Sequence, residues 1–284
     1  MLDALGSLLA ALIIVWLFGV PAFNSAGHLL DAAVVLWALP DQLADSFDGL
    51  RDAVAGDAVA VEGEVVIDEP VRAADDVVDQ TDGTVSLYVW RTTKPDMNNT
   101  LDVGSWTDPG SWTLRETRRP IDSGVEWGQF SVRNGTESIH VDPSWLRKQY
   151  NTVSFPVEMG GWLGIESARF RHWVWESPAL QLTADETTRT FDQVPDCFEN
   201  IDTERYDDYH LDSIPVRDGD TITVLGHLDV EDGKHVLRGG DGVPFAITDQ
   251  GLDAFRRYLW RRVFKHGFSL VVFTAVLLTI WYYW

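Results

Sequence analysis

The sequence predicts a mainly β, OB-like barrel domain, α+β overall, flanked by a transmembrane helix near each end of the chain. Three observations support this: an uncharged apolar segment near each terminus, a period of two among apolar residues between them, and glycine turns separating those stretches. The expected divisions are a transmembrane helix at residues 1–25, interfacial or juxtamembrane helices at 26–56, the β-rich domain at 57–252, a basic juxtamembrane helix at 253–266 and a second transmembrane helix at 267–284.

The N-terminal segment, residues 4–23, contains no charged side chain. A helix that rises 1.5 Å per residue needs about twenty residues to cross a hydrocarbon layer of about 30 Å. A secretory signal is the alternative, but it would begin with positive charge, and Asp3 stands there instead. The segment is therefore predicted to span the membrane.

A second apolar stretch, residues 26–39, contains His28 and Asp31 and ends before Pro40. We expect it to lie in the membrane interface, because a charged side chain inside the bilayer is costly. An oblique continuation of the first helix and a re-entrant hairpin remain alternatives. Residues 41–56 then place apolar side chains three or four positions apart, which predicts a short amphipathic helix.

The C-terminal segment, residues 267–284, is uncharged and closes with aromatic side chains, which favour a headgroup boundary. A dense basic cluster precedes it. Positive charge beside a span marks its cytoplasmic side, so we expect a cell-membrane protein with two spans, a cytoplasmic domain and both chain ends outside. Sequons at Asn98 and Asn134 would instead suit an exported domain, and we give them less weight. The orienting cations are Arg256, Arg257, Arg261, Arg262 and Lys265.

Acidic residues dominate the composition, with 44 Asp and Glu against 22 Lys and Arg. At molar salt the Debye length falls to about 3 Å, so such an excess is screened while the carboxylates keep the surface hydrated. The composition therefore indicates adaptation to high salt. The 13 Trp and 13 Phe argue against a disordered acidic chain. Cations are too scarce for phosphate-backbone binding, so no nucleic-acid partner is expected.

The central region alternates apolar and polar residues over several short stretches separated by Asp-Gly and Asn-Gly turns, which is typical of antiparallel strands. Residues 93–124 lack a clean period and are predicted to form a long loop or insertion. Residues 179–212 also lack one and receive no assignment. Strands are expected at residues 58–67, 84–91, 129–132, 138–141, 221–225 and 244–248.

A set of short motifs follows the order of one known family. The motif positions are Gly63, Pro70, Tyr88, Trp90, Arg91, Phe130, Gly135, Pro143, Glu204, Gly219, Asp220, Gly226, Phe245 and Asp249. Taken together, they resemble the GIDE domain, also called the BAM domain, of the membrane-embedded E3 ubiquitin ligases of mitochondria and plastids. The resemblance covers nearly the whole chain, including the order of span, domain and span. It implies a module at the membrane that contacts protein partners.

One departure from that family limits what the resemblance implies. Its ligases carry a RING after the second span, in which several Cys and His ligands hold two zinc ions. Here Cys197 is the only cysteine, which also excludes an intramolecular disulfide and a zinc site built from several thiolates. Ubiquitin transfer is therefore not carried over, and Cys197 is interpreted as a small, half-buried residue.

The histidines form no convincing catalytic or metal-binding constellation. Residues 169–175 predict a packed strand that contains His172. His210 stands in an acidic loop without a second histidine at helical spacing. We expect His227 and His235 to meet across a hairpin as a surface pair. With no serine elbow and no glycine loop followed by lysine, no catalytic residue, metal or cofactor is expected.

These observations favour a non-catalytic binding or scaffolding module, held to the membrane at both ends, with membrane lipids and an unidentified protein as partners. An enzyme is the first alternative, either a hydrolase with dispersed carboxylates or a ligase-like component that uses a RING on another polypeptide. A membrane organiser that acts through self-association, as a homo-oligomer, is the second alternative.

Overall fold

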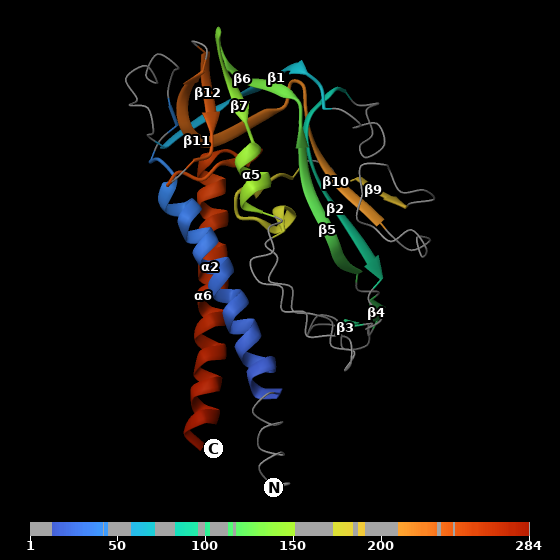
Figure 1. Ribbon diagram of the computed structural model, residues 1–284, viewed down its shortest axis with the longest axis vertical. Coiled ribbons are helices and arrows are strands. Elements are labelled where there is room, and N and C mark those ends of the chain that lie inside the picture. Colours follow the sequence, from blue (N-terminus) through green and yellow to red (C-terminus); the bar gives the residue numbers. More distant parts are fainter. Residues whose placement is uncertain are drawn as a thin grey trace.

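A β domain lies at one end of two long helices in the computed structural model, and the helices extend from it side by side (Figure 1). The order of domain and C-terminal helix follows the sequence prediction. The structure describes residues 13–41, 43–44, 58–71, 83–95, 100–102, 113–115, 118–150, 173–183, 187–190, 210–231, 234–240 and 242–283.

The centre of the domain is a closed barrel of five strands. These strands are β1 (Ala58–Glu69), β6 (Gln129–Asn134), β7 (Glu137–Asp142), β11 (Thr221–Glu231) and β12 (Lys234–Arg238). They pair in the order β1, β6, β7, β12 and β11, and β11 pairs with β1 to close the ring. Only the pair of β7 and β12 runs parallel within this ring. The prediction of a mainly β domain built on a small barrel is thereby confirmed.

Two short strands extend the barrel sheet beyond β11. They are β13 (Ala246–Thr248), which pairs with β11, and β8 (Leu180–Gln181), which pairs with β13. A second sheet has the order β5, β2, β10, β9. Its strands are β2 (Val85–Pro95), β5 (Arg118–Trp127), β9 (Thr187–Thr190) and β10 (His210–Arg217).

The segments without a clean period contain strands as well as other residues. The predicted loop at 93–124 includes β3 (Thr100–Asp102), β4 (Thr113–Arg115) and much of β5, and residues 179–212 include β8, β9 and the start of β10. The sequence did not reveal β5 because Arg118, Pro120 and Asp122 interrupt any apolar alternation. Pairing with β2, which carries a register shift at Thr92/Thr93, imposes the extended conformation instead.

The C-terminal helix α6 (Leu252–Tyr283) is 32 residues long and unbroken, or about 48 Å at 1.5 Å per residue. Its first turns belong to the domain, because Leu252, Phe255 and Leu259 are buried in the hydrophobic core at spacings of three and four. Its last half is apolar and exposed. Among the described residues, α6 is the one helix long and apolar enough to cross a membrane. The boundary predicted between residues 266 and 267 is therefore no break in the helix.

The N-terminal helix α2 (Val20–Ala38) follows a π-helical turn, η1 (Val15–Gly19), without interruption and packs along α6. The structure does not divide the chain at the predicted boundary between residues 25 and 26. The helix ends at Ala38, two residues before Pro40, and the intervening Leu39 is extended, as the sterics before a proline require. The predicted span at 4–23 lies partly outside the described residues, and its described part does not by itself make a membrane-crossing helix.

One face of α2 also belongs to the protein core. Val35 and Leu36 join the same hydrophobic cluster as the barrel strands, so this part of residues 26–39 is held by protein. The opposite face leaves Leu30, Val34 and Trp37 exposed, and its contact with lipid stays a prediction. Most of the amphipathic helix predicted at 41–56 falls outside the described residues. The Ala44 amide, in non-helical backbone, donates a hydrogen bond to the Ala60 carbonyl of β1.

We expect the buried base of α6 to contribute strongly to the stability of the domain. Phe255 is 2% exposed, whereas Phe268 on the same helix is 64% exposed. Phe255→Ala should lower the free energy of unfolding by about 3–5 kcal/mol, because it removes a large core side chain and leaves a cavity. The matched change Phe268→Ala should lower it by less than about 1 kcal/mol. Denaturant unfolding of the full chain in detergent measures both, and equal losses would contradict the packing described.

Candidate functional site

The strongest candidate site is the junction where α6 leaves the domain, because side chains from three parts of the chain meet there. A short 3-10 turn, η3 (Val174–Glu176), packs against β2 and β5 of the second sheet and is hydrogen-bonded to α6. The Arg91 guanidinium from β2 stacks on Trp175 with its Cζ 4.5 Å from the ring centroid. From the other side, Arg262 Nη2 of α6 donates a hydrogen bond of 2.6 Å to the Glu176 carbonyl. We call this arrangement the η3 clamp.

Each arginine of the η3 clamp is fixed by further partners. Arg91 Nε donates to Asp212 Oδ2 of β10 at 2.8 Å, and Thr188 Oγ1 of β9 donates to Asp212 Oδ1 at 2.9 Å. Arg262 Nη1 donates to the Tyr258 hydroxyl at 2.6 Å. Because charge-assisted hydrogen bonds are roughly twice as strong as neutral ones, the η3 clamp connects three strands of the second sheet to the helix firmly.

Tyr150 lies beside the η3 clamp, just after the short helix α5 (Ser144–Gln149). It is 3% exposed. Burial raises the pKa of the Tyr150 phenol well above its usual value, and the nearby Asp31 carboxylate on α2 raises it further, while Ser177 and Arg262 lower it. Tyr150 is therefore a neutral phenol at any ordinary pH, and it packs the junction without contributing charge.

Only part of the predicted basic cluster is free to face the surroundings. Arg256 Nη2 donates to the Pro40 carbonyl at 2.7 Å and to the Asp41 carbonyl at 3.3 Å, so it ties the end of α2 to α6. Arg262 belongs to the η3 clamp. The remaining three cations are exposed, and no ion pair within the described part of the chain involves them. They are Arg257, Arg261 and Lys265.

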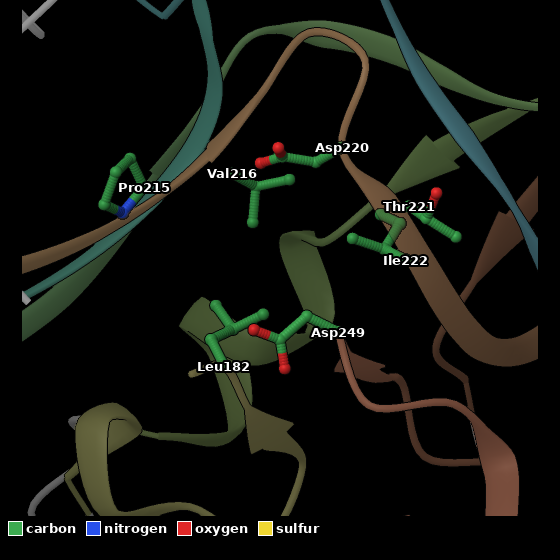
Figure 2. Close-up of a pocket in the computed structure, with 7 residues that line it drawn as sticks. All are labelled: Leu182, Pro215, Val216, Asp220, Thr221, Ile222 and Asp249. Carbon is green, nitrogen blue, oxygen red and sulfur yellow. The ribbon is translucent and has the colours of Figure 1, made fainter. Parts of the chain in front are cut away.

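A small hollow brings together two of the motif positions, Asp220 and Asp249 (Figure 2). Its volume is about 130 Å³, well below the range of about 300–1,000 Å³ usual for small-molecule sites. Both carboxylates accept hydrogen bonds from backbone amides. Asp220 Oδ2 accepts from the Arg217 amide at 2.6 Å, and Asp249 Oδ2 accepts from the Thr183 amide at 2.6 Å. The lining residues are Leu182, Pro215, Val216, Asp220, Thr221, Ile222 and Asp249.

Three barrel side chains have the residue types of a hydrolase triad but a different geometry. Ser131 Oγ lies 3.2 Å from both Asp68 Oδ2 and His140 Nδ1, and His140 Nδ1 lies 3.5 Å from the same Asp68 oxygen. A proton relay needs the acid and the nucleophile at opposite nitrogens of the imidazole. Here both meet Nδ1, so the group is a hydrogen-bonded network across β1, β6 and β7. Among the described residues, no cluster of His, Cys, Asp and Glu could hold a metal ion.

The glycine motif positions have structural reasons. A Cβ at Gly63 would lie 2.3 Å from the Arg133 carbonyl oxygen, and one at Gly226 would lie 2.7 Å from that of Arg238. Both therefore allow close approach of neighbouring barrel strands. Gly135 and Gly219 have φ of 65° and 85°, a left-handed conformation that glycine adopts readily in tight turns.

Most other motif positions fill the core or shape the backbone. Phe130, Phe245 and Tyr88 are buried, and Pro143 stands before the first residue of α5. Trp90 packs against Gly124 of β5, where a Cβ would come within 2.5 Å of the indole. Pro70 follows β1, while Glu204 lies outside the described residues. Of the motif positions, only Arg91 belongs to the η3 clamp.

Several sequence predictions on single residues need correction or fall outside the described chain. His227 pairs with Arg238 and His235 with Val230, so these histidines do not meet across the hairpin. The predicted strand at 169–175 is a 3-10 turn from Val174 on, and His172 and Cys197 lie outside the described residues. His210 begins β10 opposite Thr93 and Thr190.

The η3 clamp escaped the sequence analysis because its members are far apart along the chain. The available signal was modest: an arginine within an apolar strand and a tryptophan-rich segment just before a proline. Comparisons with protein-family models, with curated proteins and with solved structures give no significant match. The resemblance to the GIDE domain accordingly stays a prediction.

We expect Arg262 to matter for stability and its neighbour Arg261 not to. Arg262→Gln removes charged hydrogen bonds to the Glu176 carbonyl and the Tyr258 hydroxyl, and should lower the free energy of unfolding by about 2 kcal/mol. Arg261→Gln removes the same charge from an exposed position and should change it by less than about 0.5 kcal/mol. Denaturant unfolding in detergent compares the two, and a larger loss for Arg261→Gln would refute the η3 clamp.

Proposed function

We propose that the chain is a membrane-anchored, cytoplasm-facing module that binds or scaffolds other proteins. The observation that carries this proposal is the unbroken helix α6, which begins in the domain core and ends as an exposed apolar rod. An apolar helix of that length is costly in water and suited to a bilayer. A domain joined to it without a flexible linker is held at a fixed height and tilt, which is what a scaffold requires.

A second span formed by the N-terminal helix is part of the same proposal. The rings of His28 on α2 and His266 on α6 lie 4.9 Å apart, which marks one level along the antiparallel pair. Residues 13–27 therefore run beside the apolar half of α6. This alignment supports the entry of both helices into one hydrocarbon layer, with the chain ends on the far side. The basic cluster favours a cytoplasmic position for the domain.

The resemblance to the GIDE domain is consistent with this role. The barrel order, with strands taken in sequence as first, second, third, fifth and fourth, supports OB-like character. Barrels of that class bind partners through their surfaces and loops, and they need no catalytic group of their own. A ligase-like activity would need RING zinc ligands from outside these 284 residues, since Cys197 is the only cysteine in them.

Cysteine labelling in intact cells tests the orientation. In a Cys197→Ser background, Ser138→Cys places a thiol on the exposed surface of β7, and Tyr283→Cys places the matched thiol at the far end of α6. A maleimide that cannot cross membranes should label only the Tyr283→Cys chain until the cells are permeabilised. Labelling of Ser138→Cys in intact cells would overturn the cytoplasmic orientation. Recovery of the wild-type chain in the soluble fraction would overturn the anchoring.

Capture of the full chain from native membranes tests the binding role. We expect wild type to retain specific proteins that an unrelated tagged membrane protein does not. Substitutions at exposed domain positions should remove at least one of them, and Glu64, Arg133, Ser138 and Val230 provide such positions. Val230 is the strongest candidate, because it is the one large apolar side chain among the described domain residues that is notably exposed. If every variant of the series retained the same proteins as wild type, the result would count against a binding surface on the domain.

A further inference from the structure

The five cations at the base of α6 divide into two sets by the direction in which they face. Arg256 and Arg262 point toward the protein and donate to the carbonyls of Pro40 and Glu176. Arg257, Arg261 and Lys265 follow one another at intervals of four residues and are exposed. Residues spaced by four lie on one face of a helix, so these three form a continuous cationic stripe.

A stripe of exposed aromatic side chains lies beside the cations. Trp260, Phe264 and Phe268 also follow one another at intervals of four residues, and their side chains are 57%, 76% and 64% exposed. Trp260 directly precedes Arg261, and Phe264 directly precedes Lys265. On the neighbouring helix α2, Trp37 is 80% exposed. Tryptophan and cations with apolar stems gather at the boundary between hydrocarbon and headgroups, where the apolar part meets the chains and the polar part meets water.

The helical rise places the stripe at headgroup height. Measured from Gly267, where the uncharged segment begins, Lys265 lies about 3 Å, Arg261 about 9 Å and Arg257 about 15 Å above the hydrocarbon edge. The polar layer on each side of a bilayer is about 5–7 Å thick. Lys265 therefore lies within this layer. The backbone of Arg261 lies about 2–4 Å beyond it, a distance that its long side chain can span, and Arg257 lies about 8–10 Å beyond it.

We propose that Arg261 and Lys265, flanked by Trp260 and Phe264 and followed by Arg257 one turn nearer the domain, form a seat for the phosphate groups of anionic lipids. This inference rests on the proposed membrane anchoring. Charge gives it weight at low ionic strength, where a chain of formal net charge −22 is repelled as a whole by an anionic surface. The stripe reverses the sign of the charge at the place where the domain comes closest to the bilayer. Anionic lipids would thus attract the base of the domain, while the acidic surface of the barrel would be repelled by the same lipids.

Spin-labelled lipids measure this preference directly. The full chain is reconstituted in phosphatidylcholine vesicles that contain a small fraction of spin-labelled phosphatidylglycerol or phosphatidylcholine. For wild type we expect the motionally restricted fraction to favour phosphatidylglycerol several-fold. The variant R261Q/K265Q should bring the ratio close to one. The matched control R133Q/K234Q also removes two cations, from β6 and β12 of the barrel, and should keep the wild-type ratio. Millimolar inorganic phosphate should not change it, since the seat is built for a headgroup held in the bilayer.

Each other outcome decides against the inference in a recognisable way. A ratio near one for wild type, with restricted lipid still present, would overturn the seat and leave the anchoring intact. Absence of any restricted lipid would overturn the anchoring itself. An equal fall of the ratio in the control variant would show a general charge effect without a site. Wild-type ratios in R261Q/K265Q, with loss of cross-linking to a second copy, would assign the stripe to protein contact instead.

Discussion

The structure depends on one helix that belongs to two environments. The buried residues Leu252, Phe255 and Leu259 place the base of α6 in the core of the domain, and each such side chain contributes about 1.5–3 kcal/mol through burial. The same helix continues without a break into its exposed apolar half. Bending it would sacrifice backbone hydrogen bonds that have no other partner in an apolar layer. The direction in which the apolar half of α6 leaves the barrel is therefore set by the helix itself.

The arginines of α6 show how one basic segment can serve two purposes. A helix turns about 100° per residue, so neighbours in sequence face different surroundings. Arg256 and Arg262 face the protein, where a guanidinium can satisfy carbonyl groups at the end of α2 and in η3. Arg257 and Arg261, one position away from each, face outward. The cluster therefore contains two kinds of cation: two that hold parts of the protein together and others that are exposed at the surface.

The motif positions that resemble a known family mainly explain the fold. Gly63 and Gly226 permit close strands, Phe130 and Phe245 fill the core, and Asp220 fixes a turn. Residues with such roles recur wherever the same barrel is built, whatever the barrel binds. The residues that make the junction, Trp175 and Arg262 among them, are not motif positions, apart from Arg91. They join the second sheet to the helix.

The sequence by itself determined the apolar C-terminal helix, the barrel strands β1, β6, β7 and β11 and several turns, because each is encoded by a local period or by a glycine of special backbone conformation. The barrel strand β12 (Lys234–Arg238) was not among the predicted strands. The sequence did not determine β5, whose charges and proline hide its strand, or the continuity of the N-terminal helix through Asn24. It also did not reveal the η3 clamp. Arg91, Trp175 and Arg262 come from distant parts of the chain, and only the packing of the sheet against the helix brings them together. Local sequence patterns specify single helices and strands. Contacts between those helices and strands depend on how the closed barrel, the second sheet and α6 pack together and bury their apolar side chains.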